Sequence, residues 1–160
     1  MSHGWAHFSF NGRLNRKPYW IATAELIIAA LIVASGVAIV FNVTGRASTA
    51  QELLRLAHPW LTGFTLLLAY PAAAVFAKRL HDRNKTGWLA ALLIVPMLVD
   101  TWLDPSGSVT QTPLVHSIYL ATSTMTLIVA LWFLIELGFL RGTPGDNRYG
   151  PDPLASTPAG

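Results

Sequence analysis

Three short motifs carry most of the side chains in this sequence that could bind a ligand. Each motif combines arginine with aromatic or amide side chains. Guanidinium groups bind phosphate or carboxylate in a planar fork geometry, and tryptophan and tyrosine favour the membrane–water interface. The sequence therefore predicts a site for an anion, a lipid headgroup or a partner protein, with the candidate residues Arg13, Arg16, Tyr19, Trp20, Arg79, His81, Asp82, Arg83, Trp88, Asn147, Arg148 and Tyr149.

The adjacent His81 and Asp82 raise the question of catalysis. Such pairs occur in metal-dependent phosphohydrolases, but those sites need further His and Asp ligands from other helices, and suitable partners are missing here. The chain also lacks a G-x-S-x-G nucleophile motif and a P-loop. We predict no catalytic residue, no metal site and no cofactor, and an enzyme acting on lipid phosphate is a third hypothesis. Asp82 is expected to pair with an arginine of the first motif or to cap a loop, and His81 to hydrogen-bond at the interface.

Two glutamates lie well inside apolar segments, where an ionisable side chain is a functional candidate by default. Glu25 and Glu136 share a depth of roughly 6 to 10 Å from the same predicted membrane boundary, at about 1.5 Å per helical residue. They are expected to pair with Lys78 or Arg79. The alternative is that either carboxylate is the ion-coupling group of a transporter.

The composition indicates that these side chains belong to a membrane protein. Of the 160 residues, 52% are hydrophobic and 12% are charged, and the mean hydropathy is +0.45. A soluble domain has about a quarter of its residues charged, so this chain has too few to cover a water-facing surface. The absence of cysteine excludes disulfides, thiol catalysis and cysteine metal sites.

Four apolar segments approach the roughly 20 residues that a helix needs to cross a bilayer. They predict an all-α, polytopic four-helix bundle in one membrane domain, 1–150, followed by a flexible tail, 151–160. The third segment is interrupted by Pro96 and Asp100, and Asp100 is expected to reach the headgroups. The loop 42–60 is long enough for a short amphipathic helix at 51–57. The predicted spans are 20–41, 61–77, 87–103 and 118–140.

The basic residues outside these spans predict the orientation. Nine lie on the side that holds both termini and the loop between the second and third spans, and two lie on the other side. Basic loops stay in the cytoplasm, so both termini are predicted to be cytoplasmic, and the net charge of +3 requires no nucleic acid. A cleaved signal peptide is the alternative for the first span, but its apolar stretch exceeds the 7 to 15 residues typical of a signal core.

The three motifs also resemble those of a known family. They match the patterns F-x-G-R-x-x-R-x-x-[FY]-W, R-L-H-D-x-x-x-x-G-W and G-T-x-G-x-N-x-Y-G-P-D-P of the YhaH-type small bacterial inner-membrane proteins, a domain of unknown function. The resemblance implies four membrane helices with cytoplasmic ends, and it brings no known activity. The matching residues are Phe10, Gly12, Arg13, Arg16, Tyr19 and Trp20, then Arg79 to Asp82, Gly87 and Trp88, then Gly142 to Pro153.

Four-span topology places all three motifs on one membrane face. We therefore expect a non-enzymatic inner-membrane protein whose cytoplasmic arginine and aromatic face binds an anionic phospholipid or a membrane protein partner. The alternative is a small transporter or channel that works as a homo-oligomer and uses Glu25 or Glu136.

Overall fold

The computed structural model describes residues 7–103 and 112–155, and within these ranges the chain is helical and contains no strand. This confirms the predicted all-α class. The turn η2 is a π-helix that continues α5. The elements are α2 (Arg16–Val43), α3 (Ala50–Asp82), the 3-10 turn η1 (Gly87–Ala90), α4 (Ala91–Trp102), α5 (Pro113–Phe133) and η2 (Leu134–Phe139).

Three of these helical stretches are long and apolar enough to cross a membrane: Arg16–Val43, Ala50–Asp82 and Pro113–Phe139. They contain the first and second predicted spans and most of the fourth. Each of the three helices begins earlier in the sequence than the predicted span that it contains. The third predicted span is a shorter apolar helix, Gly87–Trp102. The fold is therefore that of a helical membrane protein.

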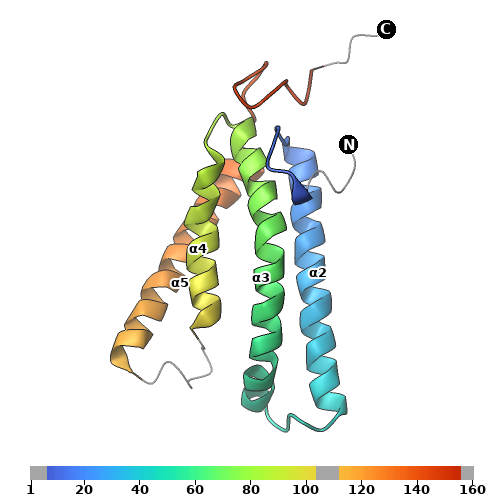
Figure 1. The fold of residues 1–160 in the computed structure, drawn as a ribbon, viewed down its shortest axis with the longest axis vertical. Helices are drawn as coiled ribbons and strands as arrows, with labels where there is room; N and C mark the ends of the chain where they lie inside the picture. Colours follow the sequence, from blue (N-terminus) through green and yellow to red (C-terminus); the bar gives the residue numbers. More distant parts are fainter. Residues whose placement is uncertain (1–6, 104–111, 156–160) are drawn as a thin grey trace.

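The helices form two hairpins that meet at one end of the molecule (Figure 1). α2 packs on α3 and α4 packs on α5, and the hairpins join where α3 contacts η1 and α4 and where η2 contacts α2 and α3. The segments before α2 and after η2 lie at this joined end. The buried apolar core lies there too, and it comprises Leu14, Tyr19, Ala22, Val75, Leu80, Ala90, Phe133 and Leu137.

Residues 51–57, where the sequence allowed a short separate helix, are helical but form the first turns of α3. The N-cap Thr49 accepts a hydrogen bond from the backbone N–H of Glu52 at 3.1 Å, and the Glu52 carboxylate accepts one from Ser48 at 2.9 Å. These two hydrogen bonds fix the start of a helix at Ala50. α3 then continues through Pro59 and Pro71, as membrane helices often do.

Asp100 has partners that the sequence did not indicate. Its carboxylate lies between α4 and α5, where it accepts hydrogen bonds from Thr122 and Thr126 of α5, the latter at 3.1 Å. The register of α4 on α5 decides this placement. A carboxylate near the C-terminal end of α4 thus contacts residues in the middle of the length of α5.

Candidate functional site

The three sequence motifs come together at the joined end of the hairpins, as predicted. The side chain of Arg13, in the first motif, contacts Asp82 in the second, 69 residues away. It also contacts the backbone of Gly145 in the third motif, 132 residues away. We call the site formed by residues 10–20, 79–88 and 139–154 the motif cluster.

Asp82 is the centre of the motif cluster. It is 2% exposed, and its Oδ1 accepts two hydrogen bonds from Arg13, from Nε at 3.2 Å and from Nη2 at 3.1 Å. Its Oδ2 accepts from Nη1 of Arg79, one helical turn earlier in α3. The prediction that Asp82 pairs with an arginine of the first motif is confirmed, and a second arginine joins the pair.

The other donors of these two arginines reach backbone carbonyl groups. Arg13 donates to the carbonyl oxygens of Thr143 and Gly145, both at 2.6 Å. Arg79 donates to those of Leu137 at 2.7 Å and Leu140 at 2.6 Å. Because Arg13 is 3% exposed and Arg79 is fully buried, their guanidinium groups hold protein segments together. This corrects the expectation that Arg13 and Arg79 themselves receive a lipid or an anion.

The arginine contacts also complete the end of the last helix. The final carbonyl groups of a helix have no intrahelical partner and need other donors. Arg79 supplies donors to Leu137 and Leu140, while the indole Nε1 of Trp20 donates to Gly138 at 3.1 Å. Side chains of α2 and α3 therefore cap η2, and the chain leaves the helix toward the third motif.

Glycine at position 142 is required by the same packing. A Cβ atom at Gly142 would overlap the carboxylate of Asp82. The backbone next to it is held by two further contacts, in which the N–H of Thr143 donates to the carbonyl of Asp82 at 2.8 Å and its hydroxyl donates at 3.0 Å. The third motif thus seats its backbone directly on the Asp82 turn.

The expectation that Glu136 pairs with Lys78 or Arg79 is wrong. Glu136 pairs with two residues that follow α3. Its Oε1 lies 3.0 Å from Nε of Arg83 and 2.9 Å from Nζ of Lys85. The π-helical turn places Glu136 beside the α3–η1 connection, while the donors of Arg79 are used by carbonyl groups and Asp82. Glu25 has its carboxylate 2.7 Å from Nε2 of His7.

His81 and Asp82 have different surroundings, so they do not form one acid–base pair. The His81 ring stacks on Tyr149 with a centroid separation of 3.9 Å and an interplanar angle of 6°, and its Nδ1 lies 3.2 Å from the carbonyl of Gly12. Asn147 donates to the His81 carbonyl at 3.0 Å. Trp88 lines a pocket together with His81 and Tyr149 and is 85% exposed. The second and third motifs therefore also meet through stacked rings.

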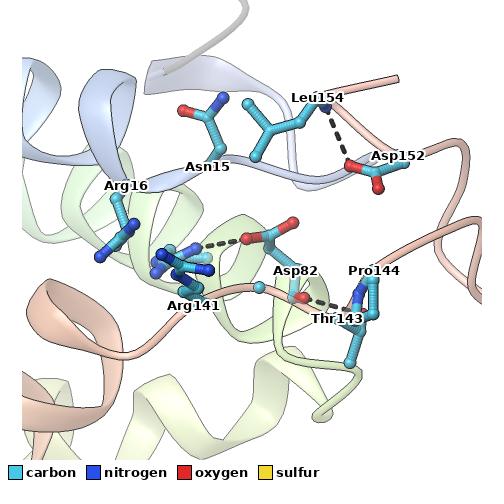
Figure 2. Close-up of a pocket in the computed structure, with 10 residues that line it drawn as sticks. Asn15, Arg16, Asp82, Arg141, Thr143, Pro144, Asp152 and Leu154 are labelled. Atoms are coloured by element: carbon cyan, nitrogen blue, oxygen red, sulfur yellow. Dashed lines mark hydrogen bonds and ion pairs between the residues drawn. The ribbon is translucent and has the colours of Figure 1, made fainter. Parts of the chain in front are cut away.

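A basic groove opens beside the buried arginines (Figure 2). One part, of about 420 Å³, lies between Asn15, Arg16, Arg141 and the Asp82 turn. The other part, of about 480 Å³, is lined by Lys17, Trp20 and Phe139 and shares Asn15, Arg16 and Leu154 with the first. We call the two parts together the basic groove. Four basic and two acidic side chains line it, so its lining is positive.

The basic groove contains donors that the protein does not use. Lys17 and Arg141 are exposed, and their side chains make no hydrogen bond or ion pair with residues 7–103 and 112–155. Arg16 donates one hydrogen bond, to the carbonyl oxygen of Phe139 at 3.2 Å. The buried Oδ1 of Asn15 also has no partner in the described part of the chain, and a half-turn of the amide would present its NH₂ group instead. The groove can therefore donate several hydrogen bonds to an anion.

Asp152 also lines the first part of the basic groove. The backbone N–H groups of Leu154 and Gly145 donate to its carboxylate at 2.9 and 2.8 Å and hold the pKa of Asp152 below its ordinary value. Residues 151–155 of the predicted tail thus fold back on the motif cluster, while 156–160 lie outside the described residues. The first part of the groove is thus lined by the carboxylates of Asp82 and Asp152 as well as by basic side chains.

Of the residues that line the basic groove, the sequence predicted Arg16, Trp20, Arg79 and Asp82 as site residues, and it missed Asn15, Lys17, Phe139 and Arg141 among others. In the sequence, Lys17 and Arg141 served only as basic residues that predict the orientation in the membrane. Asn15 occupies the N-cap position of α2 without making a side-chain cap, and an amide directly before a basic helix start was the signal for it. Phe139, whose ring lies 6.1 Å from that of Trp20, carried no sequence signal beyond its apolarity.

Comparison with known proteins identifies the family of this chain. Residues 7–151, which hold the first two motifs and all but the last two residues of the third, match the family described as "Protein of unknown function (DUF805)". The chain is 33% identical over 146 residues to the uncharacterized protein YiiR of Escherichia coli K12, covering 91% of this chain and 86% of YiiR. It is 30% identical over 149 residues to the inner membrane protein YhaI (92% and 87% covered) and 25% identical over 147 residues to the inner membrane protein YhaH (92% and 88% covered), both of the same strain. No solved structure matches the chain. The resemblance to the YhaH-type proteins is confirmed, and the chain belongs to the DUF805 family of membrane proteins of unknown function.

Proposed function

We propose that this protein crosses the inner membrane four times with both termini in the cytoplasm. We further propose that its basic groove binds the phosphate headgroup of an anionic phospholipid. The observation that carries the second proposal is the groove itself. Basic side chains with unused donors line its first part, and the aromatic rings of Trp20 and Phe139 line its second part.

The course of the chain and its charges support the topology. The C-terminal end of α3 and the end of η2 both lie at the joined end of the hairpins (Figure 1). Because α5 runs toward the joined end, α4 carries the chain away from it before α5 begins. Nine basic residues accompany the joined end and two, Arg46 and Arg55, lie near the other. Basic residues are retained in the cytoplasm, so the joined end is assigned to that side.

Labelling of single cysteines tests this topology, because the chain has none of its own. In intact spheroplasts, a membrane-impermeant maleimide is expected to label Ser48→Cys, before α3, and Thr112→Cys, before α5. It is expected to label Ala155→Cys only after the membrane is permeabilised. Labelling of Ala155→Cys in intact spheroplasts contradicts cytoplasmic termini, and protection of Thr112→Cys contradicts a membrane crossing by α4.

Lipid binding rests on how the two parts of the groove are arranged. A phosphate placed between Arg16 and Arg141 would accept charge-assisted hydrogen bonds, each contributing about 1.5–3 kcal/mol. Trp20 and Phe139 lie next to this position, where acyl chains leave the headgroup. Basic pockets between helix ends on the cytoplasmic side bind anionic headgroups in this way. Close approach of Trp20 depends on Gly138, since a Cβ there would lie 2.7 Å from the indole ring.

Native mass spectrometry of the protein in nanodiscs containing phosphatidylglycerol and phosphatidylethanolamine tests this proposal. The Arg16→Gln/Arg141→Gln variant is expected to retain at least about tenfold less phosphatidylglycerol than the wild type, since 1.4 kcal/mol corresponds to a factor of ten. The matched control, Arg46→Gln/Arg55→Gln, removes two arginines at the opposite end and is expected to retain wild-type amounts.

The controls separate specific binding from general attraction to a charged membrane. Equal phosphatidylglycerol retention by the wild type and the groove variant contradicts the proposal. Equal losses in both double variants show attraction by net charge alone, which also contradicts it. A co-purifying protein that replaces lipid in the wild-type spectrum assigns the groove to a protein partner.

A further inference from the structure

The first part of the basic groove contains a carboxylate that no basic side chain of the described structure neutralises by direct contact. Asp82 and Asp152 both line this part. Asp82 is 2% exposed, and both of its oxygens accept hydrogen bonds from the guanidinium groups of Arg13 and Arg79. Asp152 is half-buried and makes no ion pair with residues 7–103 and 112–155. Of the two carboxylates, Asp152 is therefore the one open to a ligand.

The backbone around Asp152 keeps its carboxylate ionised. Oδ1 accepts a hydrogen bond from the N–H of Leu154 at 2.9 Å, and Oδ2 accepts one from the N–H of Gly145 at 2.8 Å. These two hydrogen bonds, together with the positive charge of Arg13, lower the pKa of Asp152. An ionised carboxylate has roughly four acceptor positions, so about two remain free. They can accept a hydrogen bond from a ligand hydroxyl, whereas they repel a phosphate oxygen.

Asp152 does not lie where the phosphate is placed. Figure 2 shows the Asp152 carboxylate apart from the side chains of Arg16 and Arg141, although all three line the same part of the groove. This part has a volume of about 420 Å³, within the range of about 300–1,000 Å³ that is usual for small-molecule sites. It therefore has room for a group attached to the phosphate, and Asp152 is placed to contact that group.

Resting on the headgroup binding proposed above, we propose that Asp152 selects phospholipids whose headgroup alcohol carries free hydroxyl groups, as in phosphatidylglycerol. The phosphate lies at Arg16 and Arg141, and a hydroxyl of the headgroup alcohol donates to Asp152. Phosphatidic acid has no headgroup alcohol, so it gains no hydrogen bond from Asp152 and its phosphate is repelled. The arginines thus supply affinity for phosphate, and Asp152 determines which phosphate-bearing lipid is retained.

Native mass spectrometry of the full chain in nanodiscs with equal amounts of phosphatidylglycerol, phosphatidic acid and phosphatidylethanolamine tests this selection. Asp152→Asn is expected to retain about fivefold less phosphatidylglycerol than the wild type, because a charged acceptor forms stronger hydrogen bonds than an amide. It is expected to retain about twofold more phosphatidic acid, because a repulsion between charges partly screened by salt is removed. The matched control, Asp146→Asn, removes the same charge from an exposed residue that does not line the groove, and is expected to keep the wild-type ratio.

The opposite changes for the two lipids separate selection from a structural role. Parallel loss of both lipids in Asp152→Asn overturns the inference, because Asp152 would then only hold the chain near Leu154 in place. Asp152→Glu keeps the charge and is expected to retain phosphatidic acid at the wild-type amount; an increase like that of Asp152→Asn contradicts the repulsion.

The remaining outcomes distinguish this inference from the headgroup proposal on which it rests. An unchanged ratio of the two lipids in Asp152→Asn, with both still bound, overturns the selection and leaves phosphate binding by the arginines intact. Retention of phosphatidylethanolamine above phosphatidylglycerol that is lost in Asp152→Asn also overturns it, because the carboxylate would then bind an ammonium group. A wild-type chain that retains no anionic lipid contradicts the headgroup proposal itself, and the selection with it.

Discussion

The Asp82→Asn variant is expected to lose about 3–5 kcal/mol of stability, the usual cost of removing one partner from a buried ion pair. Arg13 and Arg79 would remain buried with no negative partner, and the amide NH₂ of the new side chain would face their N–H groups. The helices would still insert, since their hydropathy is unchanged. The joined end of the hairpins would come apart.

Urea unfolding in detergent micelles, followed by tryptophan fluorescence, measures this loss. Trp20 reports on the motif cluster because its indole donates to Gly138 and lies on the groove. Asp146→Asn is the matched control, since Asp146 is exposed and accepts one hydrogen bond, from the N–H of Asp152. Its unfolding midpoint is expected to stay at the wild-type value. Equal midpoints for both variants would show that Asp82 does not hold the cluster together.

Arg79→Lys is expected to lose about 3 kcal/mol although the charge is kept, because hydrogen bonds from charged donors contribute about 1.5–3 kcal/mol each. Arg79 reaches Asp82, Leu137 and Leu140 at once with its planar fork. A lysine ammonium is a single point and cannot reach acceptors on three sides. The end of η2 would lose its cap, and the third motif would detach from the Asp82 turn.

Limited trypsin digestion of the protein in nanodiscs distinguishes this result from a general loss of stability. Cleavage after Arg141 and Arg148 is expected to become faster in Arg79→Lys, because Arg141 directly precedes the docked third motif and Arg148 lies within it. Arg46→Lys changes an exposed arginine at the other end and is expected to leave cleavage unchanged. Wild-type digestion rates in Arg79→Lys would refute the capping role of the guanidinium group.

Much of the fold could be read from the sequence because hydropathy and charge placement are local properties. A run of apolar residues must either cross a membrane or find a core, so residues 20–41, 61–77 and 118–140 identified their helices directly. Helix ends were harder. α3 begins at Ala50 because Thr49 caps the N–H of Glu52 and the Glu52 carboxylate binds Ser48, in a sequence that hydropathy treats as a loop.

The sequence by itself determined that this is a helical membrane protein and that its three motifs converge, and it left Asp82 either pairing with an arginine or capping a loop. Only the tertiary structure decided which arginines are used. Arg13 and Arg16 have the same chemistry and nearly the same position in the sequence, yet the first is buried under the third motif and the second lines the basic groove. The partners of Arg13 lie 69 to 137 residues away. Burial of a side chain depends on where such distant segments pack, and no local pattern contains that information.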